Sequence, residues 1–342
     1  MFFFLFLYGM SFNTPSTTYY EGINKAELCI TRQDYKDALR WYDSAFARQP
    51  TALGQDLYNA ALCALETSNE VKALELCRGL AAKGVRPDFF ERKACFARLR
   101  KSKTWPDFIK AVKHLNEDFR NRNKDMFAFM DYLAARADDI HAAVIAYNNN
   151  DSIRNEAAWR YDSLSQVLLG HLQEQGYPSE EQIGVWITGD TVLRGGPRFL
   201  PIMTNRPPLV NLRFNPVFRQ FFLETGVQKG LLKPEHCLQM MMTGGDLDEN
   251  RVQLYYTLYG CDLYKTTTMS EADANTRRLA LGMSTVKDYQ EKILFAYRYP
   301  SKGFSLNLFI YQQKGLPESK EEAERYTRDH ALVKSSLTSN CY

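Results

Sequence analysis

The sequence predicts a mainly α-helical protein, in which a short solenoid of helix–turn–helix hairpins is followed by an α-rich domain with one small β-hairpin. Three observations carry this prediction. A hairpin pattern over residues 24–50 returns about 35 residues later, and most other apolar residues recur at helical spacing. Two apolar runs, 293–299 and 304–312, flank the turn residues 300–303 and indicate the β-hairpin.

The two helical hairpins align through small and apolar residues that are 35 positions apart. The aligned pairs are Ala26 with Ala61, Ala38 with Ala73, and Tyr42 with Cys77. The turns, Gln33-Asp34-Tyr35 and Ser68-Asn69-Glu70, align in the same way. A third, degraded unit is expected over residues 89–115, with Trp105-Pro106 starting its second helix. Repeats of this period stack side by side.

Residues 19–116 therefore resemble the tetratricopeptide repeat, although the Trp and Gly of the ideal first helix are absent. The resemblance implies a groove that binds an extended peptide or a helix. Some family members hold a peptide's C-terminal carboxylate with paired Asn and Lys/Arg residues. Asn24 and Asn59 are the groove candidates here, and Asn59 stands where one such Asn is expected. Because Ile23 and Glu27 occupy the partner positions, a full clamp is not predicted, and the alternative for Asn59 is an exposed helical residue.

Composition narrows the classes of partner. A net charge of +3 over 342 residues gives no electrostatic case for nucleic acid, which needs a clustered basic face. The seven cysteines form no CxxC pair, so the sequence signals no zinc or redox motif. Free, mostly buried thiols are expected. We predict a protein or peptide partner and neither a metal nor a cofactor. The oligomeric state is not predicted.

Residues 1–18 begin with an apolar run that is too short to span a bilayer. The run resembles the apolar part of a secretory signal, but no Lys or Arg precedes Lys25. The prediction is a truncated signal sequence and a periplasmic or secreted protein. The alternative is a buried N-terminal segment of a cytoplasmic protein. No other stretch is apolar enough to predict an integral membrane segment.

The second half, residues 117–316, is expected to be an α-rich domain, followed by a charged helical tail over 317–342. A long helix is predicted over 154–175, and helix starts are predicted at Ser179, Ser270 and Thr285 from their capping patterns. The order of short motifs over about 180 residues resembles a bacterial helical domain of unknown function. Those motifs are GYPSEEQIG, LPIMTN, ETGVQKGLLKPEHC, Gln253 with Tyr259-Gly260, and NTRRLALGMSTVKDY.

That resemblance implies an α-rich fold and no known activity. The family tends to carry a His after its second motif and an acidic–basic pair before its Gln…Tyr-Gly motif. This chain has Thr204, and Thr243 with Gly244, around those places. If the family has an active site, this chain has lost part of it.

Three ionisable residues keep an enzyme open as an alternative. Asp139 and His141 lie in the densest ionisable cluster of the chain, and His236 precedes Cys237. Arg277 or Arg278 would assist them. Neighbouring side chains on a helix diverge, however, and the preferred interpretation of Asp139 is a cap at a helix start. The preferred function is therefore a non-enzymatic interaction or scaffold protein. A hydrolase-like C-terminal domain and a structural component of a bacterial envelope complex are the alternatives.

Overall fold

The computed structural model describes residues 15–49, 51–146, 151–188, 192–193, 199, 222–237, 256–259, 262–266, 270–308 and 332–334. Within these ranges the chain is mainly helical, as the sequence predicts. Several predicted features lie outside the described residues. They are the apolar run at 1–14, the LPIMTN motif, Gln253, Gly260, Thr204, Thr243, Gly244 and the charged helix over 317–330.

Two helical hairpins open the described chain. Their helices are α1 (Pro15–Thr31), α2 (Tyr35–Phe46), α3 (Gly54–Glu66) and α4 (Glu70–Ala82). The 35-residue repeat is reproduced in the turns. Gln33 and Ser68 both have left-handed backbones, with φ of 59° and 60°. Asp34 and Asn69 then cap α2 and α4 by accepting hydrogen bonds from Asp37 N and Lys72 N. The local sequence therefore fixes where each second helix begins.

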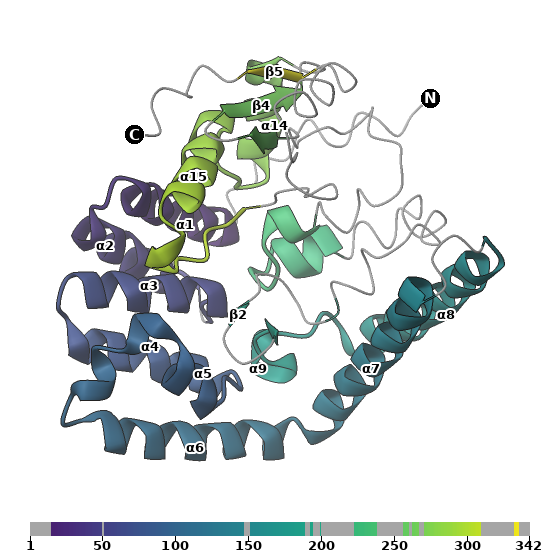
Figure 1. Cartoon of the computed structure of the whole chain (residues 1–342), viewed down its shortest axis with the longest axis horizontal. Coiled ribbons are helices and arrows are strands. Elements are labelled where there is room, and N and C mark those ends of the chain that lie inside the picture. Colours follow the sequence, from purple (N-terminus) through teal and green to yellow (C-terminus); the bar gives the residue numbers. More distant parts are fainter. Residues whose placement is uncertain are drawn as a thin grey trace.

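The helices stack in chain order, α1 on α2, α2 on α3, α3 on α4 and α4 on α6, as the column on the left of Figure 1 shows. The predicted face of α2, with Ala38, Tyr42 and Ala45, is fully buried. In the third unit, α5 (Pro87–Arg92) and the 3-10 turns η1 (Ala94–Phe96) and η2 (Leu99–Lys101) replace the first helix. Its second helix, α6 (Trp105–Arg122), starts at the predicted Trp105.

Beyond α6, the helices α7 (Lys124–Ala146) and α8 (Asp151–Gln175) pack together as an arm (Figure 1). Tyr161 Oη on α8 donates to the carbonyl of Ala137 on α7 over 3.1 Å. The prediction that Asp139 caps a helix start is wrong, because α7 runs through it without a break. The predicted capping box is confirmed at α9 (Glu180–Ile183), with Ser179 and Gln182 as its members.

The later described segments return to the hairpins. They comprise the π-helical η4 (Phe222–Val227), a helical turn at 234–237, α14 (Glu271–Ala280), α15 (Val286–Arg298) and the 3-10 turn η5 (Pro300–Lys302). Ser270 and Thr285 cap α14 and α15, as predicted. The β-hairpin predicted across 293–312 is wrong, because residues 293–298 belong to α15. Ile293 and Leu294 are buried together with Tyr289 of the same helix. Their separation of four to five residues from Tyr289 is the spacing of one helix face.

Short strands occur at other places in the chain. Strands β1 (Ile187–Thr188) and β2 (Val192–Leu193) pair antiparallel, with Ile187 opposite Leu193. A second sheet has the order β3-β4-β5, from β3 (Tyr256–Tyr259), β4 (Asp262–Thr266) and β5 (Leu332–Lys334). Both of its pairings are antiparallel, and β5 lies within the range predicted as a helical tail.

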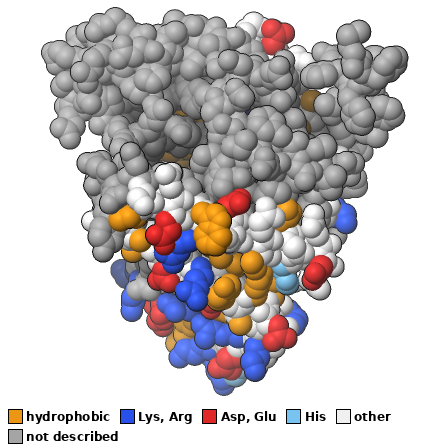
Figure 2. Space-filling view, turned by 90° about the vertical axis from the view of Figure 1, so that its right-hand side faces the viewer, with side chains coloured by type: hydrophobic (Ala, Val, Ile, Leu, Met, Phe, Trp, Pro, Cys, Tyr) orange, Lys and Arg blue, Asp and Glu red, His pale blue; other side chains and the backbone are white. Residues whose placement is uncertain are grey.

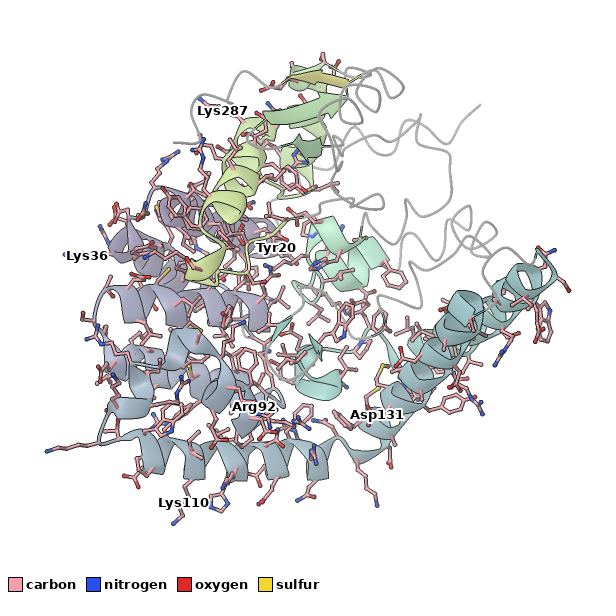
Figure 3. All side chains as sticks on the ribbon, viewed as in Figure 1. Tyr20, Lys36, Arg92, Lys110, Asp131 and Lys287 are labelled. Carbon is pink, nitrogen blue, oxygen red and sulfur yellow. The ribbon has the colours of Figure 1, made fainter. Side chains whose placement is uncertain are left out.

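Helix α3 is the centre of the described structure. All its residues from Gly54 to Leu65 are buried, whereas α2 and α4 each keep an exposed side. A helix buried on every side must have neighbours all round. Its neighbours are α2, α4 and the later segments, and one apolar cluster runs from Tyr19 to Leu306 through it. Lys36, Lys110 and Lys287 point outward from α2, α6 and α15 (Figure 3).

Replacement of the left-handed Gln33 by glycine should stabilise the protein. A left-handed backbone costs an L-residue about 1–2 kcal/mol, and glycine avoids this cost. Glycine also has more conformational entropy in the unfolded chain, which offsets part of that gain. We expect Gln33→Gly to raise the unfolding free energy by about 0.5–1 kcal/mol in urea denaturation. Arg78→Gly, on the exposed side in the middle of α4, is the control and should lower it by about 1 kcal/mol. Equal losses in both variants would contradict the assigned turn.

Candidate functional site

The most polar part of the core lies where α1 and α3 face the C-terminal half of the chain. Five buried side chains form what we call the hairpin face: Asn24 and Glu27 on α1, and Gln55, Asp56 and Asn59 on α3. Spacings of three or four residues put each set on one side of its helix. Asn24 and Asn59 are 35 positions apart, so they occupy equivalent places in the two hairpins.

Asn59, predicted either in a groove or exposed, is fully buried, and its side chain is hydrogen-bonded to the main chain of Ser305. Its Nδ2 donates to the carbonyl of Ser305 over 2.7 Å, and its Oδ1 accepts from Ser305 N over 2.8 Å. Asn24 makes an equivalent pair of contacts. Its Nδ2 donates to the carbonyl of Gly282 over 2.8 Å, and its Oδ1 accepts from Lys292 Nζ over 2.9 Å. Both sequence-selected asparagines therefore contact the C-terminal half of their own chain.

Residues 303–308, which we call the bound segment, lie along the hairpin face in an irregular, non-helical conformation. Gln55 Nε2 donates to the carbonyls of Ser305, over 2.7 Å, and Leu306, over 3.1 Å. Glu27 Oε1 accepts from Asn307 N over 2.9 Å. Tyr58 Oη donates to the carbonyl of Gly303 over 2.8 Å. Helix side chains thus bind mainly the main chain of this segment, and Gln55 Nε2 also donates to the Ser305 hydroxyl over 3.3 Å.

The side chains of the bound segment pack against apolar surfaces. The Phe304 ring stacks on Tyr35 of α2, with centroids 5.7 Å apart and an interplanar angle of 9°. Leu306 is buried in the main apolar cluster, and Leu308 packs at its edge. Phe304, Leu306 and Leu308 alternate with Ser305 and Asn307, whose N–H groups are the ones that the hairpin face accepts.

Two buried ion pairs tie the hairpin face to the same half of the chain. Lys292 Nζ on α15 lies 2.6 Å from Glu27 Oε2, and Lys233 Nζ lies 2.6 Å from Asp56 Oδ1. Tyr19 Oη donates to Asp56 Oδ2 over 2.6 Å. Burial raises the pKa of the Asp56 carboxyl, and Lys233 acts in the opposite direction. Burial alone would lower the pKa of Lys233, but Asp56 and Glu27 raise it.

Glu235 and Arg278 complete a charge layer of three acidic and three basic side chains, none more than 2% exposed: Glu27, Asp56, Glu235, Lys233, Arg278 and Lys292. Arg278 Nε donates to the carbonyl of Ser284 over 2.6 Å. Burial raises the pKa of Glu235, and Lys292 and Arg278 act against that rise. An isolated buried charge costs several kcal/mol of stability. The equal number of acidic and basic side chains in this layer offsets that cost.

Tyr20, labelled at the centre of Figure 3, joins the same region from α1. Its hydroxyl donates to the carbonyl of Leu232 over 2.7 Å and lies 3.2 Å from that of Val227. Gln49 Nε2 donates to the carbonyl of Lys229 over 2.8 Å. Main-chain groups of residues 227–232 are therefore also held by side chains of the first hairpin and of the residues that follow it.

The pocket beside Lys233 is small. It is lined by Leu53, Gln55, Pro178, Glu180, Ile183, Leu231, Leu232, Lys233 and His236, and its volume of about 20 Å³ is room for a single water molecule. His236 is buried there, and its Nδ1 has no hydrogen-bond partner among the residues that the structure describes. Burial lowers the pKa of His236 to about 3, which keeps the ring neutral. The volume does not accommodate a substrate.

The three enzyme candidates lie in different settings. Asp139 is exposed on α7 and lies 3.8 Å from Arg136 in an ion pair. His141 follows on the same helix, and its side chain is outside the described residues. His236 is buried against α3 and α9 instead. Of the two arginines, Arg278 is buried in the charge layer, and the Arg277 side chain is not described.

Other features of the described residues bear on partners. The five described cysteines are free thiols, as predicted: Cys29, Cys63, Cys77, Cys95 and Cys237. Over the described ranges, no group of His, Cys, Asp and Glu is arranged to hold a metal ion, and no helix has the length and apolarity needed to cross a membrane. On the face drawn in Figure 2, basic side chains lie among acidic and hydrophobic ones.

Comparison of the chain with protein-family models, curated proteins and solved structures finds no match. The two resemblances noted in the sequence therefore stay predictions.

Sequence reasoning did not find most of the partners in this site. Glu27 and Asp56 could have indicated a buried polar site, since each is a charged residue among buried apolar ones. Their cations lie far away in sequence, at Lys292 and Lys233, and no local pattern pairs them. The bound segment was hidden for the same reason, because its hydrogen bonds join residues about 250 positions apart.

Removal of one member of a buried pair should cost more than removal of both. Lys292→Met leaves the Glu27 carboxylate buried without its cation, so we expect a loss of about 3–5 kcal/mol in unfolding free energy by urea denaturation. The double variant Glu27→Met/Lys292→Met should recover most of that loss. Arg40→Met, which breaks an exposed pair with Asp37, should cost at most about 1 kcal/mol. A double variant no better than Lys292→Met would contradict the pairing.

The neutral His236 should make the protein sensitive to acid. Its pKa is about 3 in the folded state and about 6.5 in the unfolded chain, so between these values the unfolded state binds the extra proton. From pH 7 to pH 5 we expect this residue to lower the unfolding free energy by about 2 kcal/mol. His236→Gln should abolish that part of the pH dependence, whereas His114→Gln, at an exposed site, should leave it intact. Identical pH profiles for wild type and His236→Gln would rule out the effect.

Proposed function

We propose that the protein is a non-enzymatic interaction protein, in which tetratricopeptide-like hairpins bind an extended peptide segment of a protein partner. The observation that carries this proposal is the pair of hydrogen bonds between Asn59 and the N–H and carbonyl of Ser305. A carboxamide that contacts both groups of one residue recognises extended main chain rather than a particular side chain. Such main-chain recognition supplies affinity in many peptide-binding proteins, with specificity left to side-chain pockets.

Two further features support the proposal. Gln55, Tyr58 and Glu27 extend the same recognition over Gly303 to Asn307, so a stretch of about five residues is held. Asn24 and Asn59 repeat with the 35-residue period, which is how a repeat array duplicates a binding position. By contrast, the enzyme candidates Asp139 and His236 lie in different environments, one exposed and one buried.

Selection from a library of random 12-residue peptides tests the proposal. The bait is the full chain, both as wild type and as Ser305→Pro, which removes the N–H that Asn59 accepts and so loosens the bound segment. We expect selected peptides to bind at least about tenfold more weakly when Asn59→Leu is added, because two hydrogen bonds are lost. The readout is fluorescence anisotropy with labelled peptides.

The matched control is Asn116→Leu. Asn116 is also a buried helical asparagine that donates to a main-chain carbonyl, that of Gly84, but it lies away from the hairpin face. It should leave peptide affinity unchanged. If neither bait selects a peptide, or if the selected peptides bind the Asn59→Leu variant equally well, the proposed function is wrong.

A further inference from the structure

The bound segment interacts with the hairpins as a peptide ligand does. Every hydrogen bond described for the main chain of residues 304–307, apart from the local one from Leu308 N to the carbonyl of Leu306, is to a side chain of α1 or α3. The described residues 303–308 belong to no helix or strand. Its departure would therefore break contacts with the hairpin face but no secondary structure.

The element that carries the segment is anchored separately. Helix α15 packs on α1, and Lys292 joins Glu27 Oε2 and Asn24 Oδ1. Exposed Arg32 and half-buried Glu291 form an ion pair, 3.6 Å long, across the same helices. Among the polar contacts of the described residues, Glu27 is shared by both elements, and it uses a different oxygen for each. Apolar contacts also join the two elements, because the Phe304 ring lies 6.2 Å from that of Phe295 on α15 and Leu308 packs beside the same helix. Release of residues 303–308 would break their apolar contacts with α15 but would leave the anchor of α15 on α1 through Lys292 in place.

We infer that residues 303–308 are a built-in competitor for the partner, and that the partner is a non-helical peptide with the same alternation of an aromatic and two aliphatic residues as Phe304, Leu306 and Leu308. This inference rests on the proposed function and adds the partner's chemistry and the regulation of the site. The aromatic residue would stack on Tyr35, and the first aliphatic residue would take the buried place of Leu306. The residues between them contribute their main-chain N–H groups to Asn59 and Glu27.

The covalent link makes the competition strong. A tethered segment acts at an effective concentration on the order of millimolar. A peptide in solution can bind only those molecules whose face the segment has left, so its apparent affinity falls in proportion to that free fraction. A partner must therefore either bind tightly or arrive on the same scaffold at high local concentration. Binding would therefore select partners whose affinity or local concentration is high enough to displace the bound segment.

The test uses the full chain and a labelled peptide with the sequence of residues 302–309, KGFSLNLF. We expect Ser305→Pro to bind the peptide at least about tenfold more tightly than wild type, because its own segment no longer competes. Ser305→Ala is the matched control; it keeps both main-chain groups, loses only the 3.3 Å hydrogen bond from Gln55 Nε2 to the hydroxyl, and should stay close to wild type. Leu306→Ser is a second loosened variant, in case Ser305→Pro fails to fold as judged by circular dichroism. A KGSSSNSF peptide, which lacks the apolar alternation, should not bind.

The outcomes separate the two proposals. If wild type binds KGFSLNLF as tightly as both loosened variants do, the bound segment is not a competitor, although the proposed function stands. If the loosened variants bind library peptides but bind KGSSSNSF as well as KGFSLNLF, the inferred side-chain pattern is wrong. If the loosened variants fold and bind no peptide at all, the proposed function itself is wrong.

Discussion

The buried charge layer is the constraint on which the rest of the structure depends. Glu27 and Asp56 come from the first two hairpins, and Lys233, Arg278 and Lys292 come from the later segments. Neither set can be buried alone, since an unpaired buried charge costs several kcal/mol. The hairpins and the C-terminal half must therefore assemble together. Helix α6, which runs through the sequence-based boundary at residues 116–117, joins them without a linker.

Recognition of the bound segment is built on the same layer. Glu27 is fixed by Lys292, which positions its other oxygen for Asn307 N. Tyr19 and Lys233 hold Asp56, while its neighbour Gln55 on α3 supplies the amide that donates to the carbonyls of the segment. Polar groups that are preorganised in this way lose little freedom when they bind. The charges thus supply rigidity, while the neutral amides and Glu27 supply the contacts.

The sequence predicted those parts of the fold that local chemistry determines. The positions of the turns at 33–35 and 68–70 and the helix starts at Ser179, Ser270 and Thr285 each depend on a few neighbouring residues. The left-handed backbones at Gln33 and Ser68 and the caps at Asp34 and Asn69 came from the structure. Residues 293–299 were misassigned because a short run rich in apolar and aromatic residues fits a strand or a buried helix equally. In the folded chain this run belongs to a helix that packs against α1. The pairing of Asn59 with Ser305 could not be predicted, because it depends on how the whole chain folds back.

The two equivalent asparagines show how one repeat position can serve two purposes. Asn24 holds groups that belong to folded elements: the carbonyl of Gly282, in the left-handed turn after α14, and the ammonium of Lys292 on α15. Asn59 holds Ser305, whose main chain pairs with no strand among the described residues. The hydrogen-bonding chemistry is the same, but release from Asn24 would disrupt a folded unit, whereas release from Asn59 would not. Of the two positions, the second hairpin is therefore the one at which the proposed exchange with a partner would occur.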